Sequence, residues 1–375
     1  MSVPTPVYSE IVPNFDFEGD FIQALPYNLG HINDTHTAYY RRRDGRVQRF
    51  ILQRIKHYVF KKPEEVMENI AAITEYLRSK ISAAGGDPGR EALTLIPTRD
   101  GGAFYRTDGG DYWRAYHFIE GAQTYQIPES ARHVISAGRA FGNFQHLLRD
   151  FPVGQLHETI PDFHHTMKRF DTFVGVVESD TCNRARSAKD EIQFVLDRAE
   201  ETSVVINLIE RGELPVRVTH NDTKFNNVMI DDRTGEGVCV IDLDTVMPGA
   251  SLYDFGDAIR SIANTAEEDE RDLSKVRFDL DVFAHYTRGY LEAMGQALTP
   301  AEYENLAFSS RLMTLECGMR FLADYLSGDV YFRIQRADQN LDRCRTQFKL
   351  AREMEEYFES MLKIVEVCRT DVGNL

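Results

Sequence analysis

One stretch of the chain, residues 216–244, constrains the fold more than any other. Val216 and Val218 alternate with Arg217 before a polar segment that is too hydrophilic to lie in a core, and a short apolar run, 228–230, follows that segment. Another apolar run follows the turn 231–237, and it ends in Asp242 and Asp244. Alternating or continuous apolar residues between turn residues are typical of short strands. We therefore expect a strand, a polar loop and a hairpin-like unit, with polar groups concentrated at one end.

The polar loop has the spacing His-x-Asp-x-Lys-x-x-Asn, at His220, Asp222, Lys224 and Asn227. This spacing matches the catalytic loop of protein kinases. Asp242 follows fifteen residues after Asn227, where a kinase carries its second metal-binding aspartate. The alternative is an ordinary polar turn whose aspartates cap or solvate it. The complete set favours phosphoryl transfer from ATP, with Asp222 as the base and Lys224 close to the transferred phosphate. Asn227 and Asp242 are then the expected ligands of Mg²⁺.

Three segments carry a resemblance to a known family: HNDTKFNNVMID, VIDLDTVMPGASLYDFGDAIR and ECGMRFLADYLSGDVYF. The chain resembles the N-acetylhexosamine 1-kinases, within the aminoglycoside phosphotransferase and choline kinase-like superfamily, from Gly30 to about Glu355. The first two segments are typical of the superfamily, and the third indicates the hexosamine branch. The resemblance implies ATP-dependent phosphorylation of the anomeric (C1) hydroxyl of N-acetylglucosamine or N-acetylgalactosamine, giving the sugar 1-phosphate.

The resemblance also implies a sugar site that contains His31, Asn33, Arg320 and Tyr331, with Asp222 reaching the hydroxyl that reacts. Residues 316, 320 and 324 are spaced four apart in an expected helix, so a surface ladder of ion pairs is the alternative for that stripe.

Asp254 and Asp257 resemble a second acidic box that braces the catalytic loop. The alternative is a pair of aspartates favoured by the helix dipole. His164 and His165 lack companions at metal-ligand spacing, and we expect them to be solvated loop residues.

The expected fold is α+β and two-lobed, like that of protein kinases and aminoglycoside phosphotransferases. Residues 1–119 are expected to form a small lobe with an antiparallel sheet, and residues 120–375 a large, mostly helical lobe. Strands are expected over 21–28, 35–41, 49–55 and 111–119. Helices are expected over 190–208, 300–326 and 341–369, and over 64–81, where residues 66, 70, 73, 77 and 81 form an apolar stripe. In the small lobe, Gly30 lies in a turn suited to phosphate contact, and the alternative is an ordinary tight turn with a polar tip. Gln53 occupies the strand position where kinases usually carry a phosphate-binding lysine. The adenine is expected to meet the backbone of the strand end, at Tyr116, His117, Phe118 and Ile119.

Composition limits the partners. The formal net charge of −16 argues against nucleic acid or an anionic membrane as the main partner. Five cysteines, an odd and scattered set, indicate free thiols in a reducing compartment. No secretory signal or membrane-spanning apolar stretch is recognisable, so we expect a cytoplasmic protein, and a monomer.

Two other functions fit the same residues. One is a kinase for another small alcohol, such as an amino alcohol or an aminoglycoside. The other is a nucleotide-binding regulatory module without turnover, for which the missing strand lysine is the best argument. The intact set of Asp222, Asn227 and Asp242 is the argument against that module.

Overall fold

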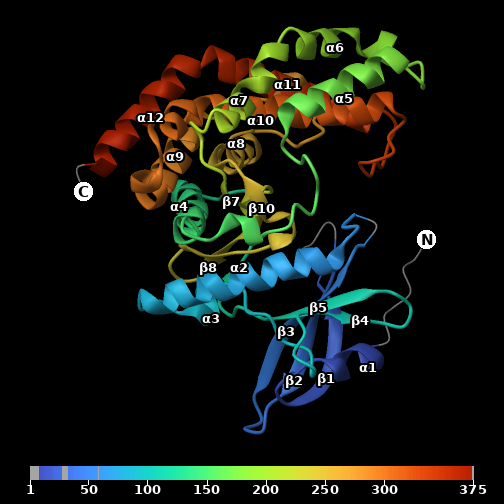
Figure 1. The fold of residues 1–375 in the computed structure, drawn as a ribbon, viewed down its shortest axis with the longest axis vertical. Helices are drawn as coiled ribbons and strands as arrows, with labels where there is room; N and C mark the ends of the chain where they lie inside the picture. The colour runs from blue at the N-terminus through green and yellow to red at the C-terminus, as the bar shows by residue number, and fades with distance from the viewer. Residues whose placement is uncertain (1–7, 28–32, 58, 374–375) are drawn as a thin grey trace. The chain divides into compact units, whose positions relative to one another are not determined.

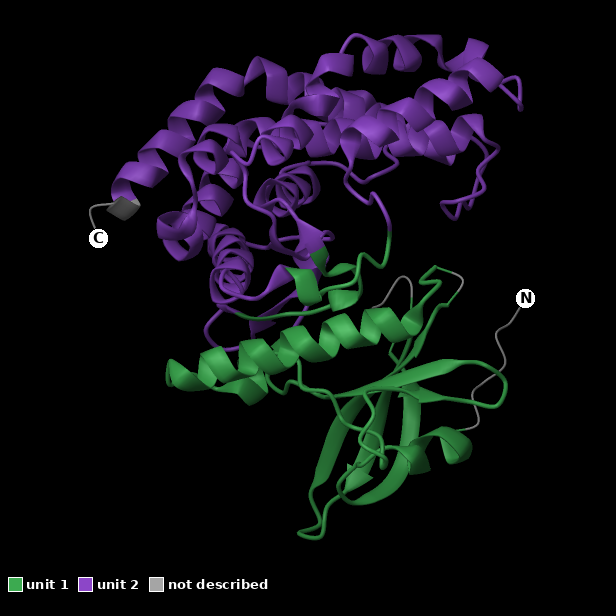
Figure 2. Ribbon diagram, viewed as in Figure 1, with its two compact units in different colours: residues 1–122, 154–160, 238–247 green, residues 123–153, 161–237, 248–375 purple. Residues whose placement is uncertain are grey.

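The computed structural model describes residues 8–27, 33–57 and 59–373 (Figure 1). The chain forms two compact units, and neither is one continuous segment (Figure 2). The first consists of residues 1–122, 154–160 and 238–247, and the second of residues 123–153, 161–237 and 248–375. A sheet dominates the first and helices dominate the second, which confirms the predicted kinase-like α+β class. The prediction had treated each lobe as continuous, whereas the segment with Asp242 packs with the sheet unit.

A five-stranded antiparallel sheet forms the centre of the first unit, in the order β1-β2-β3-β5-β4. Its strands are β1 (Asp20–Pro26), β2 (Asp34–Arg41), β3 (Val47–Ile55), β4 (Tyr105–Arg106) and β5 (Tyr112–His117). Because side chains alternate between the faces of a strand, Phe50 and Leu52 share one face of β3 and lie in the core. Gln53 points to the opposite face, where Arg114 of β5 is its cross-strand partner.

One long helix, α2 (Pro63–Ala83), accompanies this sheet; the short helices α1 (Tyr8–Ile11) and α3 (Pro88–Glu91) belong to the same unit. Pro63 occupies the first turn of α2, where a missing amide proton leaves no bond unmade. The predicted apolar stripe is buried, at Val66, Ile70, Ile73, Leu77 and Ile81.

The second unit is built from nine α-helices among the described residues. They are α4 (Ala131–Leu147), α5 (Thr166–Ser179), α6 (Lys189–Leu196), α7 (Val204–Glu210), α8 (Ser251–Ile262), α9 (Leu280–Met294), α10 (Pro300–Leu326), α11 (Gln339–Glu356) and α12 (Phe358–Gly373). The remaining strands of the chain are β6 (Ala122–Gln123), β7 (Arg217–Thr219), β8 (Val228–Asp231), β9 (Gly237–Val240) and β10 (Met247–Gly249). No helix in the described part of the chain is both long and apolar enough to cross a membrane.

Two helices that were expected to be continuous are each divided in the structure. The single helix expected over 190–208 is divided into α6, a 3-10 turn (Ala199–Ser203) and α7. At the break, the Arg198 guanidinium lies 3.5 Å from the ring centre of Phe194 and pairs with Glu355 at 2.7 Å. The terminal helix expected over 341–369 consists of α11 and α12, with Tyr357 between them.

Helices α4 and α9 approach each other closely within the second unit (Figure 1). A Cβ atom at Gly289 would lie 2.0 Å from the carbonyl oxygen of Ile135, and one at Gly138 would lie 2.3 Å from that of Tyr286. Glycine therefore lets the two backbones come into direct contact.

Candidate active site

The predicted catalytic loop is held by two buried carboxylates at the start of α8. Asp254 accepts hydrogen bonds from the backbone N–H groups of His220 at 2.9 Å and Asn221 at 2.7 Å. Asp257 accepts one from the N–H of Thr223 at 2.9 Å. The structure thus confirms that these two aspartates brace the loop. The bracing holds Asn221 in the left-handed region at φ 64°, immediately before Asp222.

The two bracing carboxylates differ in their electrostatics. Burial raises the pKa of Asp254, whose hydrogen-bond donors are backbone amides and the Gln145 amide at 2.7 Å. Burial would also raise the pKa of Asp257, but the charges of Arg260 and Lys224 outweigh it and lower that pKa. Arg260 pairs with Asp257 at 2.6 Å.

Asp222, Lys224 and Asn227 lie together in the second unit, as the spacing predicted. Lys224 Nζ is 2.9 Å from Asp222 Oδ1, and the charge of Asp222 raises the pKa of Lys224. The Asn227 amide donates to the Asp222 carbonyl at 2.8 Å. The Asp222 side chain is 26% exposed, so it can meet a hydroxyl from solvent while its backbone is fixed.

The two expected metal ligands fit the donor chemistry of magnesium. Because the Asn227 Nδ2 group is used by Asp222, its Oδ1 atom is the one left to bind a cation. Asp242 is exposed and lies two residues after the end of β9. Magnesium takes oxygen ligands and keeps several waters, so two protein oxygens together with phosphate oxygens would suffice for its shell. Within residues 8–27, 33–57 and 59–373, no group of three or more His, Cys, Asp or Glu offers an alternative site. The two ligands belong to different units.

The expectation of solvated histidines was wrong for His164, which is 7% exposed. Its Nδ1 lies 2.8 Å from Glu316 Oε1 and its Nε2 lies 3.2 Å from the carbonyl oxygen of Asn221. Glu316 is itself 1% exposed, so it is no part of a surface ladder. His164 thereby connects α10 to the catalytic loop.

The other two members of that stripe also differ from a ladder of ion pairs. Asp324 is buried and accepts from the N–H groups of residues 330, 331 and 332, which shapes the loop that carries Tyr331. Tyr331 is 64% exposed. The Arg320 guanidinium lies 5.1 Å from the ring centre of Phe163 and has no ion-pair partner in the described part of the chain.

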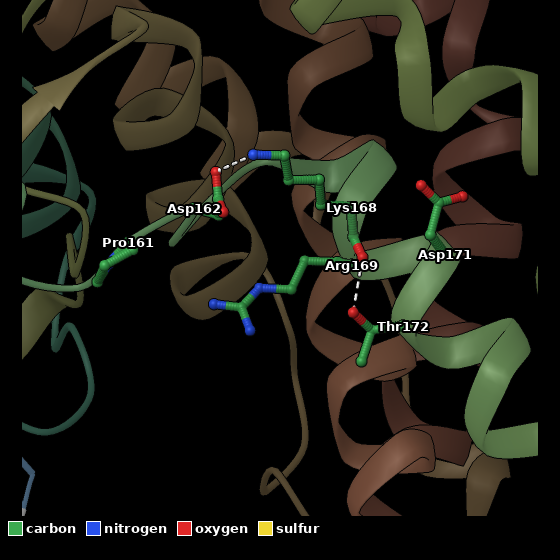
Figure 3. A pocket seen from close by; sticks show the side chains of 6 residues that line it. All are labelled: Pro161, Asp162, Lys168, Arg169, Asp171 and Thr172. Carbon is green, nitrogen blue, oxygen red and sulfur yellow. Dashed lines mark hydrogen bonds and ion pairs between the residues drawn. The ribbon is translucent and has the colours of Figure 1, made fainter.

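The charge of Arg320 acts on a second arginine, Arg169. Burial and the charge of Arg320 lower the pKa of Arg169, a residue of α5. Arg169 borders a hollow of about 410 Å³ together with Pro161, Asp162, Lys168, Asp171 and Thr172 (Figure 3). Lys168 in this hollow pairs with Asp162 at 2.7 Å. Arg169 donates only to the Phe163 carbonyl, at 3.0 and 3.2 Å, and no carboxylate among the described residues pairs with it.

Of the predicted nucleotide and sugar residues before β5, two lie outside the described residues, and the other two have side chains that are hydrogen-bonded within the first unit. Gly30 and His31 lie outside the described residues. Asn33 is 9% exposed and uses both ends of its amide, accepting from the Lys56 N–H at 3.1 Å and donating to Asp244 at 2.5 Å. Gln53 is also engaged at both ends, with Thr35 and Arg114.

The strand end expected to meet adenine is partly occupied by protein contacts. The His117 N–H donates to the Thr94 carbonyl at 2.9 Å. Tyr116 is buried, and Phe118 packs against the Arg49 guanidinium at 3.8 Å. Just beyond, Arg90 donates to the carbonyls of residues 120 and 121. The backbone of residues 116–119 stays the predicted adenine contact, with the His117 N–H already used within the protein.

Sequence reasoning missed the pair formed by Arg114 and Asp244. Both side chains are almost fully buried, and the guanidinium of Arg114 donates to the carboxylate. A signal was present, because Arg114 is the one Lys or Arg within the aromatic run DYWRAYHFI. A cation in an otherwise apolar strand requires a buried partner.

A sheet-containing unit, a helical unit and a braced HxDxKxxN loop together define a kinase-like phosphotransferase. The family model described as "APH: Phosphotransferase enzyme family" matches residues 30–296, and the chain belongs to this family.

Solved structures share the fold over nearly the whole chain. A microcompartment-associated aminopropanol kinase matches with a TM-score of 0.57 and 16% identity, covering 94% of this chain and 96% of that chain. An amicoumacin kinase, solved in complex with AMP-PNP, Ca²⁺ and Ami, matches with a TM-score of 0.57 and 14% identity, covering 90% of each chain. A choline kinase from Cryptosporidium parvum matches with a TM-score of 0.55 and 13% identity, covering 93% of each. At these identities the likeness establishes the fold alone.

Proposed function

We propose that this phosphotransferase uses ATP and Mg²⁺ to phosphorylate the anomeric hydroxyl of an N-acetylhexosamine, with Asp222 as the base. The observation that carries the phosphoryl-transfer part is the fixed backbone at residues 220–223. Such transfer depends on positioning and electrostatics more than on covalent work by the protein. Asn227 and Asp242 would hold Mg²⁺, whose bound form supplies charge neutralisation at the phosphates. Lys224 would lie near the transferred group.

The choice of a neutral sugar over a cationic alcohol is supported by the charges near the catalytic loop. Arg169 and Arg320 are guanidiniums without an ion-pair partner among the described residues. Burial and the charge of Arg320 lower the pKa of Arg169, whereas the charges of Glu316 and Asp162 act on it in the opposite sense. Arg320 packs against the ring of Phe163, and the next residue, His164, contacts the carbonyl oxygen of Asn221 in the loop that carries Asp222. A cationic amino alcohol or aminoglycoside would meet repulsion there. A neutral sugar, in contrast, can accept hydrogen bonds from Arg320 and Tyr331, and the anomeric position itself is chosen from the family resemblance.

A coupled ADP-release assay over a panel of acceptors tests this function. We expect turnover with N-acetylglucosamine or N-acetylgalactosamine, none with their methyl glycosides, and none with choline or ethanolamine. In Arg320→Met, the KM for the sugar should rise at least about tenfold while the KM for ATP changes little, because a polar pocket loses affinity when one donor is removed. Arg288→Met, a change at an exposed arginine of α9 that pairs with Glu292 at 3.0 Å, is the matched control. Phosphorylation of the methyl glycoside would place the reaction at another hydroxyl.

The same panel tests the two alternatives. The aminopropanol and choline kinases share the fold, so turnover with an amino alcohol in place of the sugar would select that function. A protein that binds ATP but turns over no acceptor would be a regulatory module, in keeping with the absence of a lysine at Gln53.

A further inference from the structure

The loop that follows β9 is held by side chains from three other parts of the first unit. Asp244 is 4% exposed, and its carboxylate pairs with Arg114 of β5, which is 1% exposed. Asn33, directly before β2, donates from Nδ2 to the other carboxylate oxygen at 2.5 Å. Asn69 of α2 donates to the carbonyl of Val246 at 3.0 Å. A strand, a loop and a helix thus converge on residues 244–246.

Asp242 lies two residues before this anchor and is itself exposed. Its backbone is in the left-handed region, at φ 59° and ψ 57°, which a non-glycine residue adopts when its surroundings hold it there. The residues that follow it, 243–247, are all buried. The exposed Asp242 is therefore followed directly by a buried segment, which fixes the position of its backbone.

The strand position that usually carries a lysine contributes to the same network. Gln53 Oε1 accepts from Arg114 Nε at 3.0 Å, and Gln53 Nε2 donates to Thr35 Oγ1 at 2.9 Å. Both ends of the amide are used within the sheet, so Gln53 orients Arg114. Arg114, the buried cation, lies on β5, the strand that pairs with β3, and its guanidinium donates to Asp244.

We propose that Asp244 is a positioning residue for the nucleotide site. Arg114 and Asn33 hold its carboxylate, and this anchor presents Asp242 to the divalent cation of a nucleoside triphosphate complex. The role assigned to Asn33 thereby changes from sugar contact to support of the metal loop. Arg114 acts on the nucleotide only through Asp244. The inference rests on the proposed metal role of Asp242, and it is independent of which acceptor is phosphorylated.

Calorimetric titration with ATP, once with Mg²⁺ and once with EDTA, tests this role. Asn33→Ala removes one support and leaves the ion pair intact, so the protein should fold. We expect a weakening of Mg·ATP binding of about tenfold or more, as is typical when an outer partner of a metal ligand is removed. Metal-free ATP binding should change by less than about twofold, since the variant does not touch the nucleotide in this scheme. Asp244→Asn should show the same selectivity with a larger loss.

The matched control is Glu302→Gln, which breaks another buried arginine–carboxylate pair, Arg217 with Glu302 at 2.7 Å, in the second unit. It should lower stability without changing the Mg²⁺ dependence of ATP binding. Hydrogen exchange in Asn33→Ala should be faster at the amides of residues 243–246 than in the wild type. Equal losses with Mg²⁺ and with EDTA, or no loss in either variant, would overturn the positioning role while leaving the kinase proposal intact. A wild-type protein without Mg²⁺-dependent ATP binding would overturn both.

Discussion

Asp222 has a fixed backbone and a partly exposed side chain, so its proposed role as the base can be tested separately from any structural role. Asp222→Asn preserves the size of the side chain and removes the negative charge that faces Lys224. We expect turnover to fall by about two to four orders of magnitude, because the base is removed. ATP affinity and thermal stability should stay near wild type. Turnover close to that of the wild type in the purified variant would remove Asp222 from the base role.

Asp257 makes the stability of the protein depend on pH. Its pKa is lower in the folded state than in the unfolded chain, because Arg260 and Lys224 are close to it in the fold. The carboxylate therefore contributes stability above the unfolded value of about 3.9, and this contribution is lost as the pH falls below it. In Asp257→Asn, the decline in the free energy of unfolding between about pH 5 and pH 3 should be shallower than in the wild type.

The same variant should be less stable at pH 7 by about 3–5 kcal/mol, because Arg260 is left buried without its counterion. Urea unfolding at a series of pH values measures both effects. A wild-type slope in the acid range would show that Asp257 is not the group responsible.

Which individual residues could be predicted depended on how far their partners lie along the chain. Asp222 and Asn227 form one local spacing, and the structure places them together. His164 was misjudged because its partner Glu316 is 152 residues away, and Arg114 was missed because Asp244 is 130 residues away. A single sequence shows the residue types but not such long-range pairs. Asp242 stays a predicted metal ligand on its spacing alone.

Among the elements, the contact between α4 and α9 depends on glycine. Gly289→Ala would place a methyl group against the backbone of Ile135, and the two helices would have to separate. We expect a loss of about 1–3 kcal/mol or more, the usual range for overpacking. Gly175→Ala in α5 is the control, because nothing lies within 4 Å of its added Cβ. That control should gain about 0.4–1 kcal/mol. Equal stability changes in the two variants, measured by denaturant unfolding, would contradict the close packing.

Most elements were predictable from periodicity and end signals. The helix expected over Pro300–Leu326 has those bounds, and Thr299 caps it with Glu302 in a capping box. The sheet strands also appeared near their expected positions. The helices that were divided lack a glycine or proline at the break. Tertiary contacts, such as that of Arg198 with Glu355, accompany the first of these breaks, and local sequence does not reveal them.

For the whole molecule, the formal net charge of −16 predicts a response to salt. Self-repulsion destabilises the compact state, and salt screens it over a Debye length of about 8–10 Å near physiological ionic strength. We expect the thermal midpoint to rise between about 0.01 and 0.2 M NaCl at pH 7.5, because exposed ion pairs contribute little to offset it. Scanning calorimetry without nucleotide measures this. A falling midpoint would mean that the ion pairs of the surface outweigh the repulsion.

Each unit consists of several separate segments of the chain, and this affects the exchange of segments between related proteins. Residues 154–160 and 238–247 belong to the sheet unit, although segments 123–153 and 161–237 of the helical unit precede them in the chain. A chimera that takes residues 1–122 from one parent and the remainder from another would combine Arg114 of the first with the residue at position 244 of the second. If that residue is not acidic, the hybrid inherits a buried cation with no counterion. The sheet unit therefore cannot be transferred as one continuous segment, and recombination between relatives must move its three segments, residues 1–122, 154–160 and 238–247, together.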